Sequence, residues 1–202
     1  MIALIDYQMG NLPSVQNALR TLGFTVQVTD DPAVVAAADG IVLPGVGAFG
    51  TGMARLRERG LVEPIRAHAR AGRPILGICL GMQLLFTESE EFGLHEGLGL
   101  IPGRVVRMPE GVKLPHMGWN QVAPVGEEQP LFDGIEDLWV YYDHSYAVTG
   151  APRGTVLAES EYGRRFPAIV AGGSAVGMQF HPEKSAAKGL RLLANWGRQA
   201  CL

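Results

Sequence analysis

The chain has 202 residues, of which 47% are hydrophobic and 18% charged, and its formal net charge is −3 with no basic block. This balance argues against a nucleic-acid-binding surface, and no apolar run approaches the ~20 residues that a membrane helix needs. A chain of this length buries about 70% of its unfolded surface, so it needs no disulfide or metal staple. Only two cysteines occur, Cys79 and Cys201, and the N-terminus lacks a signal-peptide pattern. We therefore expect a cytoplasmic protein with a single domain over residues 1–202.

The first 43 residues predict strands and helices in alternation. Residues 2–5 and 41–43 are short apolar runs typical of buried strands, and residues 24–28 alternate as a strand does. A helix is predicted between Asn11, as its N-cap, and Gly23, and a short second helix begins at Asp31-Pro32. The order βαβαβ predicts an α/β fold with a parallel sheet and helices on its faces.

A glycine-rich segment, residues 44–50, follows the third strand. Gly45, Gly47 and Gly50 match the G-x-G-x-x-G pattern of dinucleotide-binding proteins. That pattern belongs in the first strand–helix turn, with an acidic residue about 20 positions later, so we discount it here. A flexible turn and a loop whose N–H groups face a substrate oxygen both remain open. Two helical segments follow, at about 49–59 and 61–71.

Residues 74–86 are the centre of the predicted chemistry. An apolar run predicts a strand, a Gly77-x-Cys79-x-Gly81 box follows, and a second apolar stretch is typical of a buried helix. A cysteine on such an elbow is held in a strained backbone conformation that small neighbours permit. The start of the helix favours the reactive thiolate. A lone cysteine in apolar company is more often a buried hydrophobe, so catalysis requires a base elsewhere.

The second half of the chain changes character. Residues 87–99 are acidic and then glycine-rich, which predicts an exposed loop. Between residues 100 and 180 the signals are mostly β, with proline and glycine between the runs. A helix is predicted at about 186–199. No linker or repeat divides the chain.

A predicted strand at 175–180 leads into His181-Pro182-Glu183. A histidine can take the proton of a thiol and later give it to a leaving amine, and a nearby carboxylate can fix its tautomer. By itself this segment is more simply a strand end with a surface glutamate. Together with the elbow it favours a catalytic triad. His116 and His144 are secondary candidates, and neither HExxH nor CxxC occurs, so no metal or cofactor is expected.

Two stretches, residues 77–83 and 180–183, resemble the signatures of class I (triad-type) glutamine amidotransferases. The resemblance implies a flavodoxin-like fold with a mostly parallel or mixed central sheet flanked by helices, here with an additional β-rich second half. Further stretches resemble one subfamily, the glutaminase subunits of imidazole glycerol phosphate synthase in histidine biosynthesis. These stretches are Asp6-Tyr7, Gly10-Asn11, residues 44–49, Met117-Gly118-Trp119-Asn120 and His144-Ser145-Tyr146.

The resemblance implies a role for each matching residue. Cys79 would attack the glutamine side-chain amide, His181 would act as general base and acid, and Glu183 would orient His181. A cysteinyl thioester and ammonia would form, and water would then release glutamate. The residues implied to hold glutamine or its oxyanion, the latter through backbone N–H groups of Leu80 and the 46–47 loop, are Val46, Gly47, Leu80, Gln83, Glu91, Ser145 and Tyr146.

The same resemblance implies a heterodimer with a cyclase subunit, a (β/α)8 barrel. The cyclase would use the ammonia to make imidazole glycerol phosphate and aminoimidazole carboxamide ribotide, and the lone glutaminase would have low activity. Nucleic acid and membrane are not expected partners. The implied interface residues are Asn11, Ser14, Trp119, Tyr141 and Lys184. For Trp119, an interface anchor and a core position both remain open.

One departure from the family pattern lies beside the implied substrate segment. Asp143 stands where an apolar or small residue is usual, and it can alter a local pKa or the interface. Three other functions stay open. They are a stand-alone cysteine hydrolase acting on a peptide or γ-glutamyl bond, the glutaminase subunit of another biosynthetic amidotransferase, and a non-catalytic binding module that keeps the fold.

Overall fold

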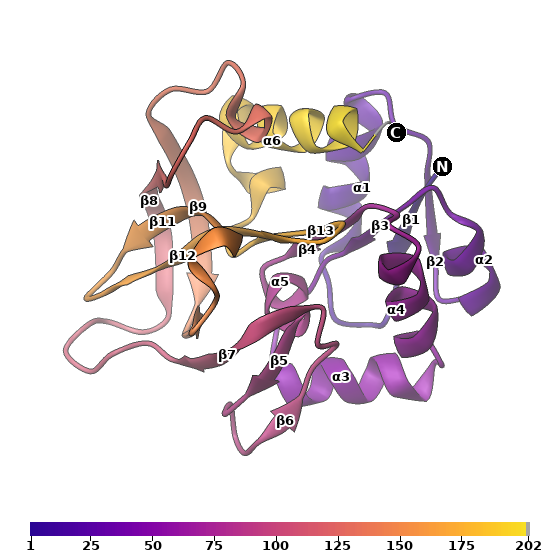
Figure 1. Ribbon diagram of the computed structural model, residues 1–202, viewed down its shortest axis with the longest axis horizontal. Coiled ribbons are helices and arrows are strands. Elements are labelled where there is room, and N and C mark those ends of the chain that lie inside the picture. Colours follow the sequence, from indigo (N-terminus) through magenta and orange to yellow (C-terminus); the bar gives the residue numbers. More distant parts are fainter. Residues whose placement is uncertain (201–202) are drawn as a thin grey trace.

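The structure, a computed structural model, describes residues 1–200, and the expectation for Cys201 lies outside them. Two β-sheets and six α-helices make up the fold (Figure 1). The larger sheet contains β1 (Ile2–Ile5), β2 (Val26–Thr29), β3 (Gly40–Leu43), β4 (Ile75–Ile78), β8 (His116–Pro124), β9 (Leu138–His144), β11 (Val156–Glu161), β12 (Arg165–Gly172) and β13 (Ala175–Met178). The smaller sheet contains β5 (Phe86–Ser89), β6 (His95–Glu96), β7 (Ile101–Arg107) and β10 (Tyr146–Thr149).

The helices are α1 (Leu12–Thr21), α2 (Pro32–Ala37), α3 (Phe49–Glu58), α4 (Val62–Arg70), α5 (Leu80–Leu84) and α6 (Ala186–Gln199). Three short 3₁₀ turns lie at Pro130–Phe132, Arg153–Thr155 and Pro182–Lys184. Within residues 1–200, none of these helices combines the length and the apolar character that a membrane crossing requires.

The N-terminal half forms the predicted parallel sheet. Strand β1 lies between β2 and β3, β4 follows β3, and all of these pairs are parallel. Alternate side chains of β1 enter two cores: Ile2 and Leu4 pack with α1 and α6, whereas Ala3 and Ile5 pack with α2, α3 and α4. The two groups of helices therefore cover opposite faces, as Figure 1 shows. Burial on both faces explains why these strands are continuous apolar runs.

The C-terminal half extends the same sheet and confirms the expected β-rich addition. Strand β13 pairs in parallel with β4, with Met178 opposite Ile78. Strands β12, β11, β8 and β9 then continue the sheet by antiparallel pairing. The order of strands thus puts the chain that follows β13 beside the chain that follows β4.

The prediction of a loop over residues 87–99 is confirmed for 90–94 and 97–99 and was wrong for the rest. The elbow helix ends at Leu84, and β5 and β6 occupy parts of the segment, in the smaller sheet. The acidic residues Glu88 and Glu90 each lie 3.6 Å from the guanidinium of Arg104, which comes from the neighbouring strand β7. Their charges are compensated across the sheet, and a local reading of the sequence cannot detect that.

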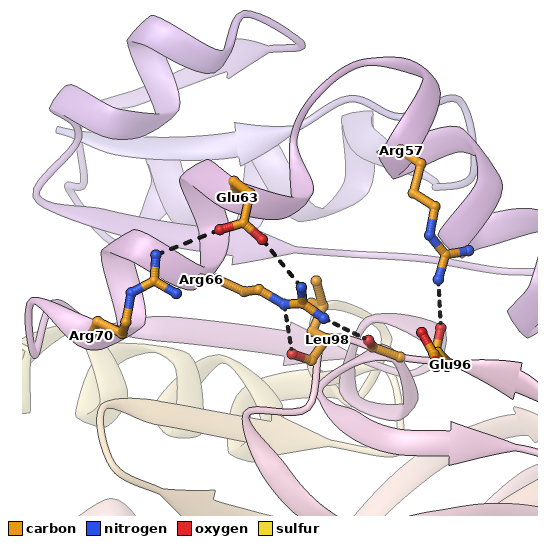
Figure 2. A network of polar contacts seen from close by, with 7 residues as sticks. Arg57, Glu63, Arg66, Arg70, Glu96 and Leu98 are labelled. Atoms are coloured by element: carbon orange, nitrogen blue, oxygen red, sulfur yellow. Dashed lines mark hydrogen bonds and ion pairs between the residues drawn. The ribbon is translucent and has the colours of Figure 1, made fainter.

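Arginines of α3 and α4 connect the smaller sheet to the helices of the larger one (Figure 2). Arg66 donates from Nε to the carbonyl of Leu98 at 3.0 Å and from Nη2 to that of Gly97 at 3.3 Å. Arg57 donates to the carbonyl of Glu96 at 3.0 Å. These bonds engage carbonyls of the 96–98 segment, and they connect the smaller sheet to α3 and α4.

Candidate functional site

The sharp turn between β4 and α5 has the strained backbone that the sequence predicted. Cys79 adopts φ 53° and ψ −108°, a conformation rarely taken by residues other than glycine. Its N–H donates to the carbonyl of Met178 at 2.8 Å. A Cβ at Gly81 would lie 1.7 Å from the Leu43 carbonyl oxygen, and one at Gly77 would lie 2.7 Å from backbone atoms of Gly81. The box glycines are therefore required by close packing around the cysteine.

The chain after β13 brings a histidine and a carboxylate to this turn. His181 Nδ1 lies 2.9 Å from Glu183 Oε1, and both side chains are buried. Because a carboxylate accepts, Nδ1 carries the proton and Nε2 is the nitrogen left for Cys79. Within residues 1–200 no hydrogen bond of good geometry engages Nε2. Because the His181 ring also interacts with the Cys79 side chain, the three predicted triad residues lie together.

Electrostatics at His181 favour the protonated ring. Burial lowers the pKa of His181, but its contacts with Cys79 and Glu183 outweigh burial and raise the pKa to about 10. An imidazolium beside Cys79 is the partner that a thiolate needs. The thiol itself is buried, with the Asp143 carbonyl oxygen 3.8 Å and Gln179 Nε2 3.9 Å from Sγ.

Cys79 opens onto a cavity of about 350 Å³. All seven residues expected to contact glutamine or its oxyanion line it: Val46, Gly47, Leu80, Gln83, Glu91, Ser145 and Tyr146. Residues missed by the sequence analysis include Phe92 and Pro115, and Asp143 and His144 also contribute to the wall. Phe92 was detectable as a bulky apolar residue in an acidic segment. Its ring is 6.4 Å from that of Tyr146.

Two backbone donors expected to face the oxyanion are already engaged. The Leu80 N–H donates to the Gly45 carbonyl at 3.3 Å, and the Val46 N–H donates to the Met9 carbonyl at 2.5 Å. Tyr7 also fixes this loop, because its hydroxyl donates to the Pro44 carbonyl at 2.7 Å. In this conformation the Leu80 and Val46 N–H groups are therefore bonded within the protein, and the loop packs directly on the elbow.

Two polar side chains of the wall are held by internal bonds. Gln83 Nε2 donates to the Tyr146 carbonyl at 3.0 Å and to Gln179 Oε1 at 3.1 Å. Glu91 Oε2 accepts the N–H of Phe49, the first residue of α3, at 2.7 Å. Burial raises the pKa of Glu91, although the bond from Phe49 opposes this. Glu91 therefore satisfies an unpaired donor at the start of α3 as well as lining the cavity.

The residues expected at an interface lie on one side of the site. Trp119 is 53% exposed, so a core position is excluded. It lies opposite Tyr141 in the β8–β9 pair, with the rings 6.4 Å apart, and Lys184 Nζ is 5.7 Å from the Tyr141 ring. Asn11, which makes no capping bond, and Ser14 come from α1, which packs on the 182–184 turn. Met117 and Trp139 are also exposed on this hairpin and were not predicted.

A strained cysteine with a His–Glu pair, at the carboxyl ends of parallel strands, is the arrangement of a cysteine-dependent acyl-transfer enzyme. The chain belongs to the glutamine amidotransferase class-I family, whose model matches residues 3–200. It is 58% identical to the imidazole glycerol phosphate synthase subunit HisH of Symbiobacterium thermophilum, over 99% of this chain and 94% of that protein. It is 54% identical to the subunit HisH of Syntrophotalea carbinolica, over 98% and 99%.

Solved structures support the fold. A crystal structure of a glutamine amidotransferase matches with a TM-score of 0.80 and 20% identity, covering 100% of both chains. The structure of PurLQS from Thermotoga maritima matches with a TM-score of 0.78 and 19% identity, covering 98% of this chain and 97% of the other. The expected class I amidotransferase fold is thereby confirmed.

Proposed function

We propose that this chain is the glutaminase subunit of an imidazole glycerol phosphate synthase in histidine biosynthesis. It hydrolyses glutamine to glutamate and ammonia and supplies the ammonia to a partner subunit. The observation that carries this proposal is the 48–58% identity, over nearly the full length, to relatives named subunit HisH. The clustered Cys79, His181 and Glu183 supply the chemistry that such a subunit requires.

We infer the following course for the reaction. The Cys79 proton passes to His181 Nε2, which gives the thiolate–imidazolium pair that the raised pKa of His181 favours, and the thiolate attacks the side-chain amide carbon of glutamine. His181 then protonates the leaving nitrogen, the C–N bond breaks, and ammonia departs from a glutamyl thioester. Next His181 takes a proton from water, the hydroxide attacks the thioester, and glutamate leaves as the thiol regains its proton. Glu183 keeps the Nδ1–H tautomer throughout, so Nε2 always faces the reacting atoms.

The engaged oxyanion donors support a low activity of the chain alone. Each tetrahedral intermediate places negative charge on an oxygen, and losing one backbone donor to that oxygen costs roughly 10²–10³ in rate. Here the Leu80 N–H is bonded to the Gly45 carbonyl. We infer that the Gly45 carbonyl moves away when the enzyme is active, so that the Leu80 N–H and an N–H of the 46–47 loop donate to the oxyanion.

The partner in this proposal is a cyclase subunit with a (β/α)8 barrel, bound as a heterodimer. Its contact surface includes Trp119, Tyr141 and Lys184 on one hairpin and turn, with Asn11 and Ser14 beside them. Exposed aromatic residues are suitable interface anchors, and three of these residues already contact one another. Sparse cysteine usage supports a cytoplasmic location as part of the same proposal.

The test is glutamate release from glutamine, with and without a histidine-pathway cyclase and its nucleotide ligand. We expect strong activation by the liganded cyclase, and complete loss of glutamate release in Cys79→Ala with cyclase binding retained. High activity of the chain alone, indifferent to the cyclase, would instead indicate a stand-alone hydrolase or another amidotransferase. Residual hydrolysis by Cys79→Ala would refute the nucleophile.

A further inference from the structure

Two buried histidines beside the cavity take no part in the triad. His116 on β8 and His144 on β9 are 4% and 6% exposed and lie directly opposite each other in the strand pair. His116 Nδ1 is 3.0 Å from His144 Nε2. The ring of His116 is stacked between Tyr162, at 4.0 Å, and Tyr142, at 4.7 Å. The pair is therefore a fixed internal structure, unlike a flexible surface histidine.

The bonding partners set the proton positions on both rings. His144 Nδ1 lies 2.8 Å from the Tyr146 carbonyl oxygen, which can only accept, so Nδ1 carries the proton. A neutral His144 then accepts at Nε2, and His116 must donate from Nδ1. His116 accepts in turn at Nε2, where the Asn120 amide nitrogen is 3.3 Å away. Every bond runs in one direction, from Asn120 to the Tyr146 carbonyl.

Charge does not disturb this arrangement at physiological pH. Burial is the main cause that lowers the pKa of His144 to about 3; the bond to Tyr146 opposes it, and the charges of His116 and His181 add to it. Burial also lowers the pKa of His116 to about 4. Both rings are thus neutral, which is the state that the hydrogen bonds require.

The chain of bonds ends on a group of the glutamine cavity. The Tyr146 carbonyl also accepts from Gln83 Nε2, and the second Nε2 proton goes to Gln179 Oε1. Gln179 Nε2 points to Cys79 Sγ, so its Oε1 is the end that accepts. Both donors of Gln83 are consumed, which leaves its Oε1 for a ligand in the cavity that it lines. Such an acceptor suits the amino or amide N–H groups of glutamine.

We propose that His144 and His116 are positioning residues of the glutamine site. They hold the Tyr146 carbonyl as an acceptor and so orient Gln83 to present Oε1 to the substrate. This inference rests on the proposed function. It explains what fixes the orientation of Gln83 in one wall of the glutamine site. Removing the His144 donor frees the Tyr146 carbonyl and allows the Gln83 amide to turn, which weakens binding of glutamine more than it slows the chemistry.

Two variants of one residue separate positioning from stability. His144→Asn keeps an N–H donor where Nδ1 stands, whereas His144→Gln moves the amide one carbon further and loses that donor. We expect His144→Gln to raise the KM for glutamine roughly tenfold, the loss of about one neutral hydrogen bond, with kcat within about threefold. His144→Asn should return KM to within about threefold of wild type. Full-chain protein is assayed alone and with saturating cyclase, with thermal unfolding measured alongside.

A variant at a second position keeps the test valid if a His144 variant does not fold. His116→Phe keeps a stacked ring and removes the donor to His144 together with the acceptor for Asn120, but it leaves the His144 donor to Tyr146 in place, so we expect a smaller rise in KM. Equal KM values for wild type and His144→Gln, or equal loss in both His144 variants in step with stability, would overturn the positioning role. Calorimetric binding of glutamine to the same variants in a Cys79→Ala background repeats the comparison without turnover. If the cyclase does not activate glutamate release by the wild type, that result contradicts the proposed function and not the positioning role.

Discussion

Glu183 is bonded through its carboxylate to His181, and both side chains are buried. The charge of Glu183 contributes to the raised pKa of His181, after the larger contribution of Cys79. A histidine with a raised folded-state pKa stabilises the protein fully below its unfolded pKa of about 6.5. That stabilisation is lost as the pH rises through the folded value of about 10.

A pH comparison of Glu183→Gln with wild type tests this electrostatic role. The amide keeps an acceptor for Nδ1–H and removes the charge, so the His181 pKa falls. We expect the free energy of unfolding of wild type to exceed that of the variant by more at pH 6 than at pH 10. Urea unfolding at the two pH values measures the difference. A difference independent of pH would show that Glu183 does not stabilise the imidazolium.

Trp119 is the residue on which the proposed interface depends most. Exposed tryptophans are frequent hot spots, and truncating a hot spot costs at least about 2 kcal/mol. We expect Trp119→Ala to raise the Kd for the cyclase at least tenfold, with unchanged thermal stability. Trp139→Ala is the control, because Trp139 is similarly exposed but bonds through its indole N–H to Asp137 at 3.1 Å. If both variants lose the same affinity for the cyclase, the interface also extends along β9. If neither loses affinity, the interface does not include the β8–β9 hairpin.

At the scale of elements, the elbow depends on contacts between backbones. A methyl group at Gly81 meets the Leu43 carbonyl of β3, and neither atom belongs to a flexible side chain. We expect Gly81→Ala to lower the free energy of unfolding by about 1–3 kcal/mol or more, through overpacking. Gly154→Ala is the control, since nothing lies within 4 Å of its added Cβ. If denaturant unfolding gives the same free energy of unfolding for the two variants, β3 and the turn can move apart without loss of stability.

Elements with a strong local pattern could be predicted from the sequence, and those that depend on distant partners could not. The helix at 186–199 has the expected bounds because its apolar residues recur at helical spacing, and the strand at 2–5 because its apolar run is continuous. The strands within 87–99 escaped prediction because Arg104 compensates their charges from another strand. The contact of Leu80 with Gly45, and the His116–His144 pair, depend on loop packing and strand register, which short-range patterns do not specify.

In the whole molecule, the smaller sheet is connected to the larger sheet and its helices by polar as well as apolar contacts. Arg66 supplies two hydrogen bonds to carbonyls of the segment between β6 and β7 and an ion pair with Glu63. Among the described residues, Arg70 makes only an exposed pair with Glu63 at 3.6 Å. We expect Arg66→Ala to lower the free energy of unfolding by about 1.5–3 kcal/mol, as for hydrogen bonds to charged groups. Arg70→Ala should change it by less than about 0.5 kcal/mol. If urea unfolding shows the same change in the free energy of unfolding for both variants, apolar contacts alone connect the smaller sheet to the helices.

The pairing of β4 with β13 has a consequence for the protein while it is being made. The Cys79 N–H is bonded to Met178, and the histidine beside the thiol follows β13, about a hundred residues after the cysteine in the chain. Cys79 therefore leaves the ribosome long before β13, the strand that completes the structure around the Cys79 turn. The nascent polypeptide carries an ordinary thiol, and reactivity arises only when late synthesis inserts β13 into the sheet.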